Sequence, residues 1–288
     1  MTTPVLTFAV MTVREAARRR LLIVLAILTL VSVGLTTLGI GNLVSLGREE
    51  GVEPLEIEIA VSQILIFTAF MFSFVMAMTA AFLGAPAIAS DIESGVAQAI
   101  LARPVRRAEL LGGKWIGLAI VTATYAAISG LLQIGAVGVV TGYSPPQPLA
   151  AVAYLAGESV ILLTLALALS TRLGAIASGA ICVVTFGLAW MAGIVGAIAV
   201  AFDAEGLRRV IDVAKLLLPT EILWRGVVFS LEPPAFILAA GLGPRGAMAA
   251  ANPFFADTPP PAPSLVWAVV WVVGMLALAA RSFERREL

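Results

Sequence analysis

The sequence contains no histidine, a single cysteine and only 12% charged residues. Without histidine, the chain cannot carry Ser-His or Cys-His catalysis, an HExxH zinc site or His-ligated haem. The lone Cys182 cannot form an intrachain disulfide, and its place inside an apolar run favours a buried thiol. No G-x-x-x-x-G-K-[ST] stretch occurs, so the chain does not bind ATP through a P-loop. We therefore predict no catalytic or metal-binding residue, and a net charge of zero gives no indication of a nucleic-acid partner.

Hydrophobic residues make up 60% of the sequence. They occur in runs longer than about 18 residues, each long enough to cross a hydrocarbon core of roughly 30 Å. Such runs leave little room for a soluble domain, so we predict an all-α polytopic membrane protein with a single transmembrane domain, 1–288. The six predicted spans cover residues 21–41, 59–84, 115–140, 149–170, 175–201 and 264–280.

Basic residues gather on one side of these spans. They precede the first span, lie between spans two and three and between four and five, and follow the last: Arg14, Arg18, Arg19, Arg20, Arg103, Arg106, Arg107, Lys114, Arg172, Arg281, Arg285 and Arg286. The positive-inside rule predicts that this side, with both termini, is cytoplasmic. The excess of arginine over lysine is typical of a GC-rich bacterial genome, so the expected location is a bacterial inner membrane.

The segment before the first span, residues 3–20, has helical spacing. Leu6, Val10, Val13 and Ala17 fall on one face and charged residues on others, which favours an amphipathic helix lying along the membrane surface. A plain cytoplasmic tail is the alternative.

The connection between spans two and three is the most informative stretch. Ser90 and Glu93 have the spacing of a capping box, and Asp91 adds a negative charge in a first helical turn. Pro104 suits the first turn of a second helix that continues into span three. The pattern predicts a short docking helix for a cytoplasmic partner, or else an ordinary basic loop.

Three stretches of this connection resemble the signature of type-2 ABC exporter permeases. They are Glu93-Ser94-Gly95, Leu101-Ala102-Arg103-Pro104-Val105-Arg106-Arg107 and Glu109-Leu110-Leu111-Gly112-Gly113-Lys114. The resemblance extends to the arginine-rich entry, the six spans and the long external segment before the last span. Within the family the chain is most similar to the permease of the copper-maturation system for nitrous oxide reductase. Val96 stands where the family often has threonine.

The resemblance implies a homodimer of this chain with two cytoplasmic subunits that bind ATP and Mg²⁺, and no cofactor in the chain itself. It makes residues 3–20 an elbow helix and residues 90–103 the coupling helix. The residues implied in ATPase coupling are Ser90, Asp91, Glu93, Gly95, Arg103, Pro104 and Arg106. The function implied is ATP-driven export. The alternative is a mechanical transmitter that acts on an external protein without moving a substrate.

Three polar side chains fall inside predicted spans: Gln63, Gln133 and Glu158. An intramembrane carboxylate costs roughly 2.5–3.5 kcal/mol at mid-span, so Glu158 needs a partner, a cavity or a proton. Consecutive antiparallel spans could bring Gln133 and Glu158 together. The three residues then line an external gate, or they form hydrogen bonds that merely hold the helices together.

Residues 202–263 are too polar to span the membrane and too apolar to be disordered. Two amphipathic helices are expected there, one from about 207 to 218 and one after Pro219. Trp224 and Arg225 are candidates for an external lid or a dock for an accessory protein, since tryptophan suits the membrane interface. The alternative is a hydrophobic cover over the span ends.

Overall fold

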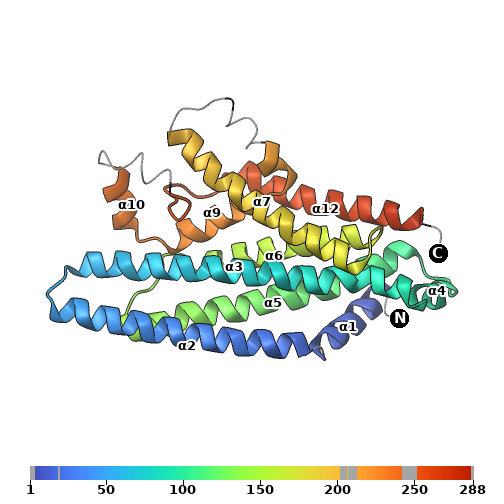
Figure 1. Ribbon diagram of the computed structural model, residues 1–288, viewed down its shortest axis with the longest axis horizontal. Helices are drawn as coiled ribbons and strands as arrows, with labels where there is room; N and C mark the ends of the chain where they lie inside the picture. Colours follow the sequence, from blue (N-terminus) through green and yellow to red (C-terminus); the bar gives the residue numbers. More distant parts are fainter. Residues whose placement is uncertain (1–3, 19, 202–205, 207–212, 242–251, 287–288) are drawn as a thin grey trace.

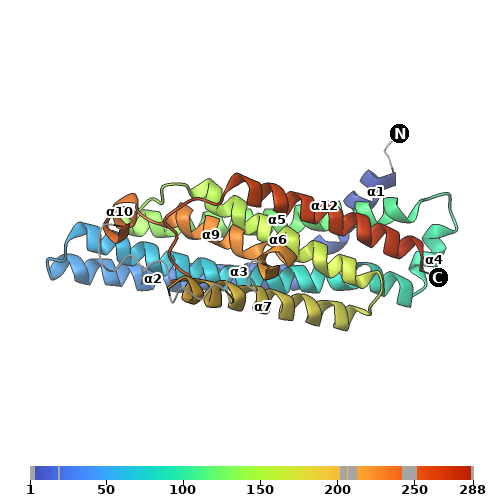
Figure 2. The ribbon, with the colours of Figure 1, turned by 90° about the horizontal axis from the view of Figure 1, so that it is seen from above.

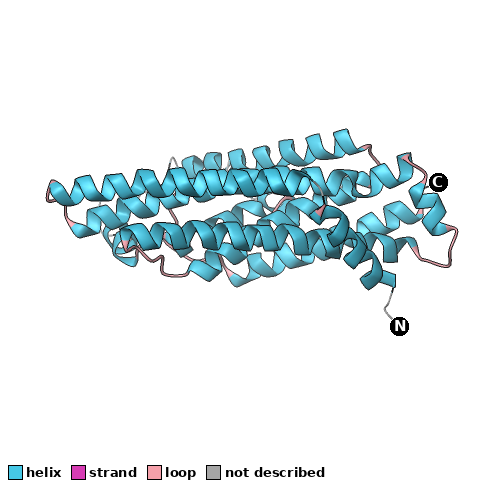
Figure 3. Ribbon diagram, turned by 90° about the horizontal axis from the view of Figure 1, so that it is seen from below, coloured by secondary structure: helices cyan, strands magenta, loops and turns pink. Residues whose placement is uncertain are grey.

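The computed structural model describes residues 4–18, 20–201, 206, 213–241 and 252–286. In this part of the chain every regular element is a helix (Figure 3). Six helices are long and apolar enough to cross a membrane, which confirms the predicted fold class. The long helices are α2 (Arg20–Glu49), α3 (Pro54–Glu93), α5 (Arg107–Thr141), α6 (Pro148–Ser170), α7 (Ala175–Ala201) and α12 (Ala262–Glu284). The shorter helices are α1 (Pro4–Ala17), α4 (Val96–Leu101), α9 (Thr220–Leu231) and α10 (Pro234–Gly241).

The long helices run side by side along the longest axis of the molecule (Figures 1 and 2). Both termini and α4 lie at one end, and the connection between α2 and α3 lies at the other (Figure 1). An even number of spans brings the chain back to its starting side, so this arrangement agrees with the span count. We call the end that holds α4 the α4 end.

α3 and α6 form the centre of the bundle. Within the most apolar 18 residues of each helix, 61% of those in α3 and 56% of those in α6 are buried, against 17% in each of α2 and α12. Gly84 of α3 permits the contact, because a Cβ there would lie 3.0 Å from Ala166 Cβ and 3.1 Å from the carbonyl oxygen of Leu163. The apolar faces of α2 and α12 are uncovered in a single chain, which leaves them for lipid or a second copy.

α1 packs into a notch on α5 made by two glycines. A Cβ on Gly113 would lie 2.7 Å from the carbonyl oxygen of Val5, and one on Gly117 would lie 2.6 Å from that of Ala9. This is the G-x-x-x-G arrangement, in which small residues let two helix backbones approach closely. The notch fixes α1 to the start of α5.

The face of α1 that packs against α5 is not the apolar stripe of Leu6, Val10, Val13 and Ala17 that the sequence spacing indicated. Ala9 and Ala16 are buried, whereas Leu6 and Val10 are 52% and 43% exposed. Small residues make the contact with α5 because the notch admits only a close approach. The larger apolar side chains Leu6 and Val10 therefore stay exposed, and the position of α1 at a membrane surface stays a prediction.

Outside the spans, α9 and residues 252–261 cover part of the bundle on the side away from α4 (Figure 1). Half of the first expected external helix, residues 207–212 of 207–218, lies outside the described residues, and residues 213–217 are helical. The helix expected after Pro219 is confirmed as α9.

Candidate functional site

The expected capping box at the start of a coupling helix is wrong. Ser90 lies inside α3, and its hydroxyl donates to the carbonyl oxygen of Pro86 one turn earlier. A serine within a helix can make this backward bond, which leaves it unavailable as an N-cap. Glu93 is the last residue of α3 rather than part of a new first turn.

Gly95 is the residue that ends α3. Its φ of 77° lies in the left-handed region, and its N–H donates to the carbonyl oxygen of Ile92 at 3.2 Å. A left-handed glycine is the common way to stop a helix, because other residues meet steric strain there. The chain then turns into the short helix α4, Val96–Leu101, which lies within the predicted coupling segment 90–103; its coupling role stays a prediction.

A buried ion pair joins the end of α3 to the start of α5. Lys114 donates to the carboxylate of Asp91 and also, at 2.6 Å, to the carbonyl oxygen of Ala87. The Lys114 and Asp91 side chains are only 12% and 17% exposed. The sequence contains just two lysines. The lysine directly after Gly112 and Gly113 was therefore the sequence feature that could have indicated this ion pair. Sequence reasoning included Asp91 but missed its partner.

The second helix begins later than Pro104 suggests. Pro104 and Arg106 lie in a non-helical stretch, and α5 starts at Arg107. The N–H of Arg106 donates to Glu109 Oε2 at 2.9 Å, which satisfies one of the free N–H groups at a helix start. The helix-capping carboxylate is therefore Glu109 and not Glu93.

Arg107 ties the start of α5 to the end of α12. Its guanidinium donates to the carbonyl oxygens of Phe283, Glu284 and Arg286 at 2.8, 3.1 and 2.6 Å. It also lies 5.7 Å from the centre of the Phe283 ring, a cation–π contact. A cation that binds the last carbonyls of a helix stabilises its C-terminus. Sequence reasoning used Arg107 for the topology and the family signature and missed this contact with α12.

The surface left exposed at the α4 end combines charged and apolar groups. Glu93, Gln98, Ala99 and Arg103 are exposed, and Val96 is 45% exposed. Neither Glu93 nor Arg103 makes a side-chain ion pair with a described residue. We call these five residues the α4 surface. The ion pair between Asp91 and Lys114 and the left-handed turn at Gly95 set the path of the chain that leads into this surface.

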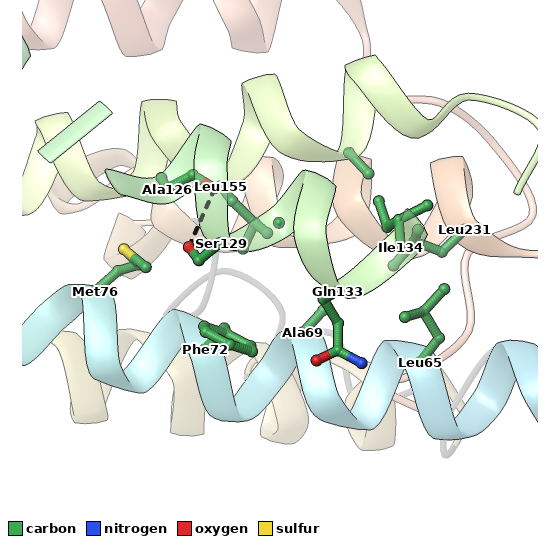
Figure 4. Close-up of a pocket in the computed structure, with 12 residues that line it drawn as sticks. Leu65, Ala69, Phe72, Met76, Ala126, Ser129, Gln133, Ile134, Leu155 and Leu231 are labelled. Carbon is green, nitrogen blue, oxygen red and sulfur yellow. Dashed lines mark hydrogen bonds between the residues drawn. The ribbon is translucent and has the colours of Figure 1, made fainter. Parts of the chain in front are cut away.

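Gln133 lies in the middle of the bundle and projects from α5 towards α3 (Figure 4). It lines a cavity of about 20 Å³ together with Leu65, Phe72 and Ser129. Both polar atoms of its amide lack a hydrogen-bond partner among the described residues. A space of this size holds a single water molecule and no larger substrate.

Glu158 is 2% exposed and sits beside Ser73 of α3. The expected meeting with Gln133 is wrong: neither the Gln133 amide nor Glu158 Oε2 finds a partner in the described part of the chain. The offset between the helices explains this, because Val152 rather than Glu158 faces Gly130 of α5. Glu158 therefore lies more than a turn further along the bundle.

Gln63 lies beside the cover formed by α9 and residues 252–261 and apart from Gln133 and Glu158. It lies next to Glu232, which follows α9, is fully buried and accepts a hydrogen bond from the N–H of Ala256 at 3.2 Å. Burial raises the pKa of Glu232 to about 8, with a further increase from Asp257, while Ala256 and Gln63 oppose the shift. This carboxyl group fastens residues 252–257 to the end of α9.

Trp224 and Arg225 lie next to each other on α9 but have different surroundings. Trp224 is 4% exposed, donates to the carbonyl oxygen of Pro253 at 3.0 Å and makes edge contacts with Phe70 and Phe254. It anchors the cover to α3, whereas an interfacial tryptophan would face lipid. Arg225 is half-buried and lines two cavities.

The sequence as a whole can now be compared with known families. A search of the curated proteins finds no match. Residues 9–288 match the family described as ABC-2 family transporter protein. That match covers all six candidate spans, the α4 surface and the cover formed by α9 and residues 252–261. The chain therefore belongs to the ABC-2 transporter family, as a membrane-spanning, non-catalytic permease subunit of the kind that works with ATP-binding subunits.

Proposed function

We propose that the α4 surface docks onto a cytoplasmic ATPase and that two copies of this chain form an ATP-driven exporter in a bacterial inner membrane. The observation that carries the proposal is the free pair of opposite charges, Glu93 and Arg103, exposed on a turn whose path is set by the buried ion pair and Gly95. A rigid turn can transmit motion that a flexible loop would absorb.

The orientation rests on charge. Arg14, Arg18, Arg103 and Arg285 are exposed near the α4 end, and the glutamates after α2 lie at the opposite end. The positive-inside rule favours a cytoplasmic α4 end, which is where an ATPase and its ATP and Mg²⁺ are found. Export polarity rests on the resemblance to type-2 exporters.

The uncovered apolar faces support a homodimer. Leu35 and Leu38 of α2 are 68% and 69% exposed, and Val184 and Leu188 of α7 are 60% and 64% exposed. The small volume beside Gln133 is also consistent with a substrate path between two chains rather than inside one.

The alternative is a mechanical transmitter to an external protein, as the similarity to the nitrous oxide reductase maturation system suggests. It is favoured by the firm attachment of the cover formed by α9 and residues 252–261. Trp224 and Glu232 both hold residues 252–257, and Tyr143, after α5, donates to the carbonyl oxygen of Leu231 at 2.6 Å. Motion of the spans would then reach an accessory protein directly. Substrate uptake into vesicles holding the purified complex distinguishes the two functions.

The docking proposal is tested by Glu93→Arg. Reversal of this charge should lower the amount of ATPase that co-purifies with the tagged chain by about tenfold or more, since a charge-assisted contact contributes about 1.5–3 kcal/mol. The variant should still insert and melt normally, because the Glu93 side chain is exposed and pairs with no described residue.

The matched control is Glu56→Arg, the same substitution at an exposed position near the opposite end. It should leave co-purification unchanged. Glu109→Arg is unsuitable because Glu109 caps α5. Full ATPase binding and activity in Glu93→Arg would reduce the α4 surface to a simple connection.

A further inference from the structure

Two adjoining cavities lie where α7, α9 and α12 meet on the side away from α4. One, of about 190 Å³, is walled by Trp190, Trp224 and Phe255. The other, of about 570 Å³, is walled by the proline-rich segment before α12 and by Trp267. Both are lined by Lys215, Glu221 and Arg225, so they share a wall, and we call the two cavities together the cleft. The larger cavity falls in the usual size range of ligand sites.

Among the described residues that line the cleft, the Arg225 guanidinium has no partner. Lys215 pairs with Glu221 at 3.3 Å, which neutralises both. Arg225 makes no hydrogen bond or ion pair with any described residue, although it is half-buried. Asp257 lines the smaller cavity but is exposed to water and forms no ion pair in the described part of the chain. A half-buried guanidinium is costly to desolvate unless an anion satisfies it, and its fork of donors suits phosphate.

Apolar residues, two of them tryptophans, lie beside the cleft at the start of α12. Trp267 and Trp271, in the first turns of α12, donate their indole N–H groups to the carbonyl oxygens of Leu216 and Leu217 at 3.2 and 2.8 Å. Tryptophan is typical of the headgroup level of a bilayer. Leu216 and Leu217 are 54% and 71% exposed, so they offer a surface for acyl chains beside the cation.

We propose that this cleft binds an anionic lipid of the outer leaflet. Arg225 holds the phosphate group, and the acyl chains lie against Leu216, Leu217 and Trp267. This site goes beyond the proposed coupling to an ATPase, because binding requires neither ATP nor a partner subunit.

The test uses the purified full-length chain in detergent, titrated with phosphatidylglycerol or phosphatidylcholine. Bound lipid is counted by native mass spectrometry, and the melting temperature is recorded in parallel. The wild type should bind phosphatidylglycerol about tenfold more tightly than phosphatidylcholine, as expected for one charge-assisted contact. Arg225→Gln should lose that preference, and Arg225→Lys should keep part of it. Asp257→Asn should increase affinity for phosphatidylglycerol.

The matched control is Arg48→Gln, which removes an arginine at the end of α2 that donates to the carbonyl oxygen of Thr141 outside the cleft. It should bind both lipids as the wild type does. Equal binding of the two lipids by the wild type, or an unchanged preference in a normally melting Arg225→Gln, overturns the proposal. Inorganic phosphate added as competitor separates the two phosphate sources. If millimolar inorganic phosphate displaces the lipid from the wild type but not from Arg225→Gln, the site recognises free phosphate and the lipid assignment is wrong.

Discussion

Gly113→Ala combined with Gly117→Ala is expected to separate α1 from α5. Each new Cβ would meet a backbone carbonyl oxygen, at 2.7 Å for Val5 and 2.6 Å for Ala9, and a backbone atom cannot rotate away as a side chain does. Overpacking of one site costs about 1–3 kcal/mol, so two sites should destabilise the chain by about 3 kcal/mol or more. A lower melting temperature in detergent and faster proteolysis within α1 would report the separation.

The control places the same alanines where the bundle has room. A Cβ on Gly112 or Gly135, also in α5, would meet no atom within 4 Å. Gly112→Ala with Gly135→Ala should therefore raise stability slightly, because alanine favours a helix over glycine by roughly 1 kcal/mol. If both double variants melt alike, the glycine notch does not hold α1.

Lys114→Met should strongly destabilise the end of the bundle that holds the α4 surface. The Asp91 side chain is 17% exposed in the intact protein, and the variant leaves its carboxylate without its cation. Removal of one partner from a buried pair costs about 3–5 kcal/mol. The melting temperature should fall, and ATPase co-purification should fall with it, because the ion pair that sets the path of the chain into the α4 surface is lost.

A double variant separates loss of the pair from loss of packing. Asp91→Leu with Lys114→Met removes both charges, and replacement of a buried pair by apolar groups is often neutral. The double variant should recover most of the stability that Lys114→Met loses. Lys215→Met breaks a pair whose lysine is 32% exposed and should cost at most about 1 kcal/mol. A mild effect of Lys114→Met alone would show that the ion pair does not brace α3 against α5.

The spans and their number could be predicted because both follow from local hydropathy and length. Helix ends were harder. Ser90 had two possible hydrogen bonds, and the backward bond to Pro86 prevailed because α3 continues until Gly95 supplies a left-handed stop. A capping-box spacing cannot reveal which of the two bonds forms.

Contacts between distant parts of the chain could not be predicted. Whether Gln133 meets Glu158 depends on the offset between α5 and α6, which is set by Gly130 against Val152. The same limit hid the contact of Arg107 with the end of α12, more than 170 residues away. In each case the residue type indicated that the side chain needs a partner. The packing of the helices then identified the partner of Arg107 and showed that Gln133 has none among the described residues.

Cross-linking of the α4 surface to the ATPase tests the central claim most directly. Single cysteines at Val96 and at Thr258, in a Cys182→Ser background, place one exposed probe on the α4 surface and one in residues 252–261, on the side away from α4. In the assembled complex, the account predicts that a short bifunctional reagent links Val96→Cys to the ATPase and leaves Thr258→Cys unlinked. A link from Thr258→Cys, or none from Val96→Cys in a complex that still co-purifies, would contradict it.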